Sequence, residues 1–219
     1  MTAVPAGGDG SPAEYPISFS VDYPDRPLNR VATAFRVILI IPIAIVLSLI
    51  SGWQTGDAGV DNGRAFVLTA GGLLFAAPLL MILFRHKYPR WWFDWNVALL
   101  RFQNRVSSYL FLLRDEYPST DEEQAVHLEV SYPQADRDLN RWLPLVKWFL
   151  AIPHLIVLGF LYIATFFVVL VAWFAILFTG RYPRGMFHFV VGVMRWSNRV
   201  VGYAFLLTTD RYPPFRLEQ

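Results

Sequence analysis

The feature that most constrains the fold of this chain is an internal repeat. Residues 87–106 read KYPRWWFDWNVALLRFQNRV and residues 181–200 read RYPRGMFHFVVGVMRWSNRV, with nine of the twenty aligned positions identical. Upstream, Leu28-Asn29-Arg30 matches Leu139-Asn140-Arg141 at an offset of 111 residues. Self-similarity over such a distance predicts that the chain folds as two similar units packed together.

The repeat divides the chain into parts. The first copy covers residues 15–118 and the second covers residues 126–215, with a linker at 119–125 between them. The matches lie 111 residues apart upstream and 94 apart downstream, so 17 residues, 111 minus 94, are missing from the second copy, opposite the polar loop at 51–66. Residues 1–14 are rich in glycine, proline and small side chains, and we expect a flexible tail there.

Composition indicates a membrane protein. Hydrophobic residues make up 55% of the chain and charged residues only 16%, against about 25% charged in a typical soluble domain. Val31–Ile50 and Phe66–Phe84 are apolar runs close to the ~20 residues that a spanning helix needs. Basic residues flank both runs on one side, which predicts that both ends of this hairpin are cytoplasmic.

In the second copy, the apolar run is longer. Trp142–Phe178 contains 37 residues, which would extend ~55 Å as one helix. The two basic aromatic segments should lie on the same side of the membrane, which requires an even number of crossings. We therefore interpret 142–178 as a tight hairpin turning near Gly159–Thr165; the alternative is an interfacial helix followed by one span. This predicts a multi-pass protein of the plasma membrane with both termini cytoplasmic.

Short alternating segments predict strands. ISFSVDYP (17–24) and VHLEVSYP (126–133) place apolar residues at every second position and end at a proline. The runs at 107–113 and 202–208 are either further strands or continuations of the preceding helices. The expected fold class is mainly α and integral to the membrane. It is a tandem repeat of a transmembrane hairpin and a cytoplasmic amphipathic helix, with a small cytosolic sheet.

The repeated segments predict amphipathic helices over about 90–106 and about 184–200. One face of each is basic and the other is aromatic or aliphatic, which is typical of a helix in the membrane interface. The predicted lipid- or partner-contacting residues are Arg90, Trp91, Trp92, Trp95, Arg101, Arg105, Arg184, Arg195, Trp196 and Arg199. The alternative is that these faces pack as ordinary core, with Arg105 and Arg199 pairing with Asp115 and Asp210.

Three ionisable residues fall inside the predicted spans. Arg36 and Lys147 occupy equivalent positions near the helix entries, and His154 lies deeper, where the first copy has an isoleucine. Ionisable groups within a span are functional hypotheses because their insertion is costly. Pro42 and Pro153 recur in the first helix of each unit and predict kinks.

Parts of the second copy resemble a known family. The segments FAILFTGRYPRG (174–185), LLTTDRYPPF (206–215) and RWLPLVKWFLAIPHLIVL (141–158) are similar to bacterial, mainly actinobacterial, integral membrane proteins catalogued only as a domain of unknown function. The resemblance is strongest over about 126–215 and recurs, diluted, over about 15–118. It implies an integral membrane protein, and it brings no activity or cofactor.

These observations predict a non-enzymatic protein. The chain has no cysteine, its four histidines show no ligand spacing, and no catalytic signature appears, so we expect neither a metal nor a cofactor. The leading hypothesis is a scaffold or accessory subunit that engages anionic lipid headgroups and a membrane-protein partner or a second copy, without nucleic acid. The alternative is a small-solute or lipid channel or carrier that uses the proline-kinked helices and His154. An enzyme acting on a lipid headgroup ranks third.

Overall fold

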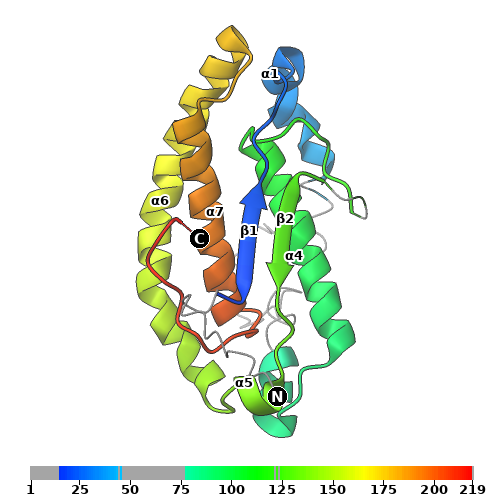
Figure 1. Ribbon diagram of the computed structural model, residues 1–219, viewed down its shortest axis with the longest axis vertical. Helices are drawn as coiled ribbons and strands as arrows, with labels where there is room; N and C mark the ends of the chain where they lie inside the picture. The colour runs from blue at the N-terminus through cyan, green and yellow to red at the C-terminus, as the bar shows by residue number, and fades with distance from the viewer. Residues whose placement is uncertain (1–14, 44, 46–76, 121, 123, 219) are drawn as a thin grey trace, which may run out of the picture.

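The computed structural model describes residues 15–43, 45, 77–120, 122 and 124–218 (Figure 1). The described elements, labelled as in Figure 1, are strands β1 (Ile17–Val21) and β2 (Val126–Val130), helices α1 (Arg30–Leu39), α4 (Arg90–Leu110), α5 (Ala135–Asp138), α6 (Leu143–Thr179) and α7 (Arg184–Ala204), and the short π-helix η1 (Met81–Arg85). The predicted tail at 1–14 and the polar loop at 51–66 lie outside the described residues.

The small sheet confirms the two Tyr-Pro-terminated strands. β1 and β2 pair antiparallel with Phe19 opposite Leu128 at the centre of the register. In β1, Ile17, Phe19 and Val21 are buried while the two serines between them are half-exposed, as the alternating pattern predicts. The two strands come one from each half of the sequence, so the sheet joins the halves.

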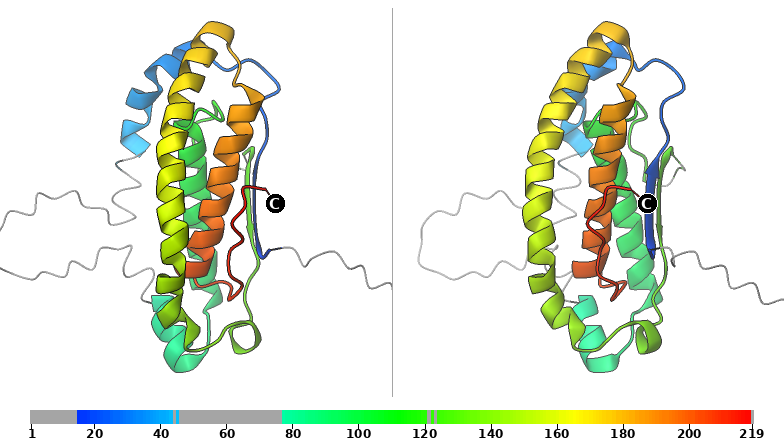
Figure 2. Two further views of the ribbon diagram at one scale, coloured as in Figure 1. Left: turned by 90° about the vertical axis from the view of Figure 1, so that its left-hand side faces the viewer. Right: turned by 60° about the vertical axis from the view of Figure 1, so that its left-hand side comes forward.

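The molecule is built in three layers (Figure 2). The strands form one outer layer, α4 and α7 form the middle layer, and α6 with α1 forms the other outer layer. β1 packs on α7 and β2 packs on α4, while α6 lies along α7. The largest apolar core lies between the sheet and α7, and its central residues include Phe19, Leu128 and Phe187. The middle layer, formed by α4 and α7, therefore has protein on both of its faces.

The middle layer is held by a reciprocal contact between two asparagines. Asn104 Nδ2 donates to Asn198 Oδ1, and Asn198 Nδ2 donates to Asn104 Oδ1, both at 2.8 Å. Each amide also donates to the carbonyl four residues earlier in its own helix, on Leu100 and Met194. Both side chains are buried, and the two residues stand 94 positions apart, as do the repeated segments.

Helix α6 corrects the interpretation of 142–178. The expected turn near Gly159–Thr165 is not present, because α6 runs unbroken for 37 residues and ends only at Gly180, whose φ of 72° is left-handed. A glycine commonly ends a helix in this way. Pro153 lies inside α6 and does not end it. A Cβ atom at Gly159 would meet nothing within 4 Å, so this glycine is not required by close packing.

The first copy is described in part. Of the predicted span at 31–50, the structure describes α1 and helical residues at 41–43 and 45, with an interruption at Ile40 just before Pro42. Of the span at 66–84, it describes residues from 77 onward, which lead into η1. Within the described residues, α6 is the one helix long and apolar enough to cross a membrane, which is weak evidence for membrane association. The described residues therefore do not support the four-span topology.

The second pair of predicted strands is also corrected. The helices expected over about 90–106 and 184–200 are α4 and α7, which continue to Leu110 and Ala204. The runs at 107–113 and 202–208 thus begin as the last turns of these helices, which was the alternative interpretation. Leu112 and Leu207 then adopt positive φ values of 64° and 56° as the chain turns away.

The asparagine pair generates a stability prediction. Asn104→Ala leaves the buried Asn198 amide without its partner, and we expect a loss of about 1–3 kcal/mol in the free energy of unfolding. Asn104→Leu combined with Asn198→Leu removes both polar groups, and should cost clearly less than the sum of the two single Leu substitutions. A double-mutant cycle followed by thermal unfolding in detergent measures the coupling; strictly additive losses would contradict it.

Candidate membrane-contacting site

The outer face of α6 is apolar along its whole length. Its most exposed side chains are large and hydrophobic: Trp142, Phe149, Ile156, Phe160, Ile163, Phe166, Phe167 and Phe178. Phe149, Phe160 and Phe178 are 72%, 70% and 76% exposed, at opposite ends and in the middle of the helix. Val31, Phe35 and Ile38 extend this surface onto α1. Contiguous apolar patches of this extent mark a contact with membrane or protein.

The inner face of α6 is a continuous buried stripe. Its members are spaced by three, four or seven residues, so they lie on one side of the helix: Lys147, Ala151, His154, Leu158, Thr165, Ala172 and Ile176. The stripe runs from the first turn to the last, so protein covers the same side of α6 over its whole ~55 Å. Three of the seven side chains are polar, and the partners of two of them, Lys147 and His154, fix the position of α6.

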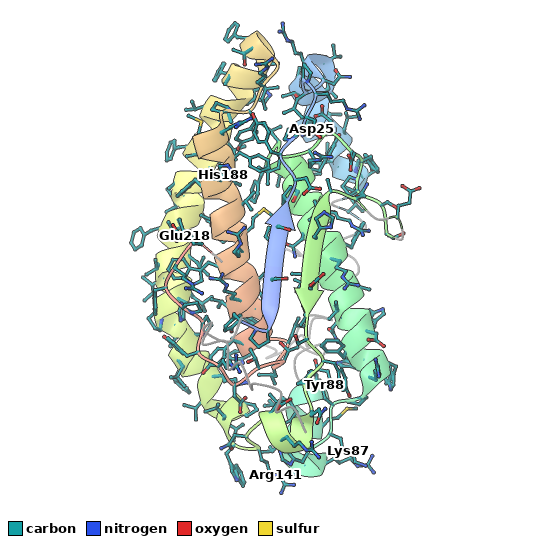
Figure 3. All side chains as sticks on the ribbon, viewed as in Figure 1. Asp25, Lys87, Tyr88, Arg141, His188 and Glu218 are labelled. Carbon is teal, nitrogen blue, oxygen red and sulfur yellow. The ribbon has the colours of Figure 1, made fainter. Side chains whose placement is uncertain are left out.

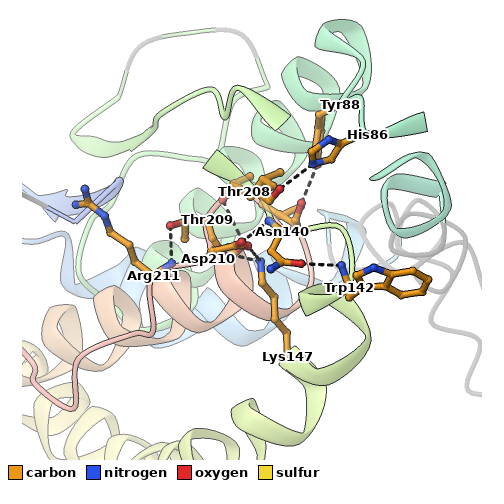
Figure 4. Close-up of polar contacts among 12 residues, drawn as sticks. His86, Tyr88, Asn140, Trp142, Lys147, Thr208, Thr209, Asp210 and Arg211 are labelled. Carbon is orange, nitrogen blue, oxygen red and sulfur yellow. Dashed lines mark hydrogen bonds and ion pairs between the residues drawn. The ribbon is translucent and has the colours of Figure 1, made fainter. Parts of the chain in front are cut away.

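Lys147 is anchored by the segment after α7 (Figure 4). Its Nζ lies 2.7 Å from Asp210 Oδ1 and donates to the Thr209 carbonyl at 2.7 Å, and its side chain is fully buried. Asp210 Oδ2 also accepts from the backbone N–H of Asn140, just before α6. The Asp210 carboxylate thus links the start of α6 to the segment that follows α7.

Arg36 makes the corresponding contacts in the first half. Its guanidinium pairs with Asp115 and donates to the carbonyls of Tyr109 and Arg114. Asp115 also accepts from the backbone N–H of Asn29, which caps α1. The Arg36 guanidinium lies 4.4 Å from the Tyr109 ring centroid, and Lys147 Nζ lies 5.1 Å from the Tyr203 ring centroid.

Sequence analysis missed this anchor. It placed Arg36 and Lys147 at the membrane entry and considered Arg105 and Arg199 as the partners of Asp115 and Asp210. The structure assigns the carboxylates to Arg36 and Lys147 instead. The signal was present, because Asn29 and Asn140 match at the same offset of 111 as Arg36 and Lys147.

Arg101 and Arg195 bind the outer edges of the sheet. Arg101 Nε donates to the Leu128 carbonyl at 3.0 Å, and Arg195 Nε donates to the Phe19 carbonyl at 2.9 Å. These are the two residues opposite each other at the centre of the strand pair. Each guanidinium therefore satisfies a backbone carbonyl that would otherwise be unpaired at a sheet edge.

Arg105 and Arg199 hold loop segments. Arg105 donates to the Ser119 carbonyl, and the buried Arg199 donates to the carbonyls of Arg216 and Glu218 near the C-terminus. Burial lowers the pKa of Arg199, and the neighbouring Arg216 and Arg195 lower it further. The predicted basic stripe is thus used largely within the protein, on backbone carbonyls.

The tryptophans predicted to contact lipid or a partner differ in their exposure. Trp91 and Trp95 are exposed near the start of α4, and Trp92 is half-buried between them. Trp196, in contrast, is buried against α6. The guanidinium of Arg90 lies 5.5 Å from the Tyr132 ring centroid, and that of Arg184 lies 5.3 Å from the Tyr23 ring centroid, each across the two halves.

His154 is enclosed by aromatic rings. Its Nδ1 accepts from Trp196 Nε1 at 3.1 Å, and its ring stacks on Phe215 with centroids 3.9 Å apart. Tyr212 completes the enclosure at 4.7 Å. The Trp196 indole is thus the hydrogen-bond partner of this histidine.

Comparison with known protein families gives a match in the second part of the chain. A family model described as Domain of unknown function (DUF4389) matches residues 142–216. This confirms the resemblance to a family of unknown function over α6, α7 and the segment that follows. No curated protein and no solved structure matches the chain significantly. The bacterial range of the family and the weaker match over 15–118 stay predictions.

The Lys147 anchor generates a second stability prediction. Asp210→Asn keeps an acceptor for the Asn140 N–H but leaves the buried Lys147 charge uncompensated, so we expect a loss of about 3 kcal/mol. Adding Lys147→Met removes the charge and should restore much of that loss. Asp94→Asn, on an exposed part of α4, is the matched control and should change stability by less than about 0.5 kcal/mol. If the double variant is no more stable than Asp210→Asn, the buried charge is not the cause.

Proposed function

We propose that this protein is a non-enzymatic membrane scaffold that lies in one leaflet, with α6 and α1 parallel to the membrane plane. The apolar outer layer contacts lipid, the middle helices lie above it, and the sheet faces water. The observation that carries this proposal is the apolar outer face of α6, which extends along a helix whose other face is covered by protein throughout. The sheet layer is then the surface offered to a protein partner.

Lipid is the cover that the outer layer requires. A helix that is hydrophobic on all sides needs an apolar environment on all sides. The middle layer supplies it on one face of α6. On the other face, side chains such as Phe149 and Phe160 would otherwise meet water, at a cost of roughly 1.5–3 kcal/mol for each large side chain. A membrane surface covers all of them together.

The sheet layer favours an in-plane orientation of α6 over a spanning one. Upright in a bilayer, α6 would bring the layers packed along it to the same depth. His127 and Glu129 are exposed on the sheet, and a two-stranded sheet has open edges that hydrocarbon cannot satisfy. A helix of ~55 Å also exceeds the ~30 Å hydrocarbon core. Lying flat, α6 removes both conflicts.

This orientation also preserves the sidedness expected from the repeat. The basic aromatic segments of both copies need an even number of crossings between them, and zero crossings satisfies that condition. The recurring contacts support a pseudo-two-fold axis through the Asn104–Asn198 pair and the Phe19–Leu128 pair. Such an axis passes through the layers, so it is normal to the membrane when the layers lie flat.

The carrier hypothesis gains no support from the arrangement of its residues. His154 is fully buried and engaged with Trp196 and Phe215, and Pro153 lies within a continuous helix. The scaffold is therefore the function that we carry forward.

Depth measurements test the orientation. The chain has no cysteine, so Phe149→Cys, Phe160→Cys and Val171→Cys each give a single labelling site on the outer face of α6. The first and last of these positions are 22 residues apart, or ~33 Å along the helix. If α6 lies in the membrane plane, lipids that carry a quencher at one fixed depth should quench a fluorophore at each of the three positions equally. Glu129→Cys, on the sheet, is the control and should react with water-soluble reagents.

A spanning helix predicts a different pattern for the same labels. Position 160 would then be deepest, and positions 149 and 171 would lie near opposite surfaces of the bilayer. Such a gradient would refute the in-plane proposal.

A further inference from the structure

The end of the molecule around η1 contains a basic cavity. The cavity has a volume of about 600 Å³ and is lined by Met81, Arg85, His86, Lys87, Tyr88, Pro89, Tyr132, Pro133, Gln134 and Ala135. These described lining residues include two cationic side chains and a histidine, and no carboxylate. Arg90 adds a further cation, since its guanidinium lies over the lining Tyr132 ring. The cavity is therefore suited to an anionic ligand.

The opposite end of the molecule differs in charge. A cavity of about 330 Å³ there is lined by residues that include Arg26 and Arg114 but also Asp25, Asp115 and Glu116. Figure 3 labels Lys87 and Arg141 at one end and Asp25 at the other. The difference follows from the sequence, because the first copy reads RHKYPR at 85–90 where the second reads TGRYPR at 179–184. This end therefore carries one more basic residue in the repeated segment, Arg85 where the second copy has Thr179.

His86 holds a costly backbone conformation in this cavity. It has a φ of 51°, where the matching residue of the second copy is Gly180 with a φ of 72°. Glycine adopts this region freely, and His86 adopts it as the left-handed cap of η1. The ring Nε2 lies 2.8 Å from the Leu139 carbonyl, so it carries the proton and fixes the ring on the cavity wall.

The cavity lies at the border between the apolar and polar surfaces. Leu80 and Phe84, on the helical segment that leads into it, are 51% and 73% exposed. Arg85 and Lys87 follow directly and are exposed. With the outer layer in lipid, this sequence puts two apolar side chains at the acyl chains and two cations at the phosphates.

We propose that the cavity lined by Arg85, His86 and Lys87 binds the phosphate headgroup of an anionic phospholipid. This proposal rests on the in-plane orientation proposed above, which brings the cavity to headgroup level. It makes the protein a scaffold with one lipid-selective end. Arg85 and Lys87 supply the charge, and the His86 ring, held by the Leu139 carbonyl, supplies a fixed wall.

Vesicle flotation tests the site. The protein is compared on vesicles of phosphatidylcholine alone and on vesicles containing phosphatidylglycerol. Arg85→Gln combined with Lys87→Gln should reduce the affinity for the phosphatidylglycerol vesicles about 30-fold, from two charges near an anionic surface, and leave binding to phosphatidylcholine unchanged. The matched control, Arg26→Gln combined with Arg181→Gln, removes two exposed charges from the opposite end and should lose far less.

The outcomes separate this site from the membrane orientation. Equal losses in the two double variants, or equal binding of the wild-type protein to both vesicles, would overturn the headgroup site and leave the in-plane proposal standing. Phe160→Glu should weaken binding to both vesicle types; selective loss on phosphatidylglycerol without that effect would support the site and overturn the in-plane proposal. The remaining measurement is the binding of glycerol phosphate in solution. If it binds the detergent-solubilised protein as tightly as the vesicles do, the ligand is a soluble phosphate ester and the lipid assignment is wrong.

Discussion

The rest of the structure depends on one constraint: over 37 residues, α6 carries large apolar side chains on every side, and its buried polar side chains, Lys147, His154 and Thr165, lie on the covered face. Such a helix cannot be placed against water on any face. Among the residues that the structure describes, α7, α1 and the segment that follows α7 cover one face, and the other face is exposed. The layered arrangement follows, because everything polar must then lie on the covered side. The sheet, with its exposed charged side chains, is at the greatest distance from the uncovered face.

Polar contacts within this arrangement fix positions more than they add stability. Arg36 and Lys147 enter the apolar layer only where a carboxylate and backbone carbonyls meet them. Arg101 and Arg195 satisfy carbonyls at the edges of the sheet. Each contact joins elements that are far apart in the sequence, so it specifies one way of stacking the layers. Apolar contacts alone would allow these layers to slide past one another.

The sequence predicted local features well where one period dominated. Alternation in ISFSV and VHLEV predicted two strands, and the basic and aromatic periodicity of 90–106 and 184–200 predicted helices at the places of α4 and α7. It failed where periodicity carries no information. The run at 142–178 is apolar at every phase, and a spanning helix, a hairpin and a helix in the membrane plane share that pattern. Likewise, an arginine on a helix face is compatible with a lipid phosphate and with a backbone carbonyl.

By itself, the sequence determined that the chain is 55% hydrophobic and only 16% charged, and that a basic and aromatic segment occurs twice, 94 residues apart. These properties depend on composition and spacing, which are local. Only the tertiary structure decided that α6 is continuous, that the carboxylates pair with Arg36 and Lys147, and that strands from opposite halves form one sheet. These features depend on which groups, distant in the sequence, come into contact. A buried charge or an unpaired carbonyl binds whichever partner the packing brings within hydrogen-bond distance.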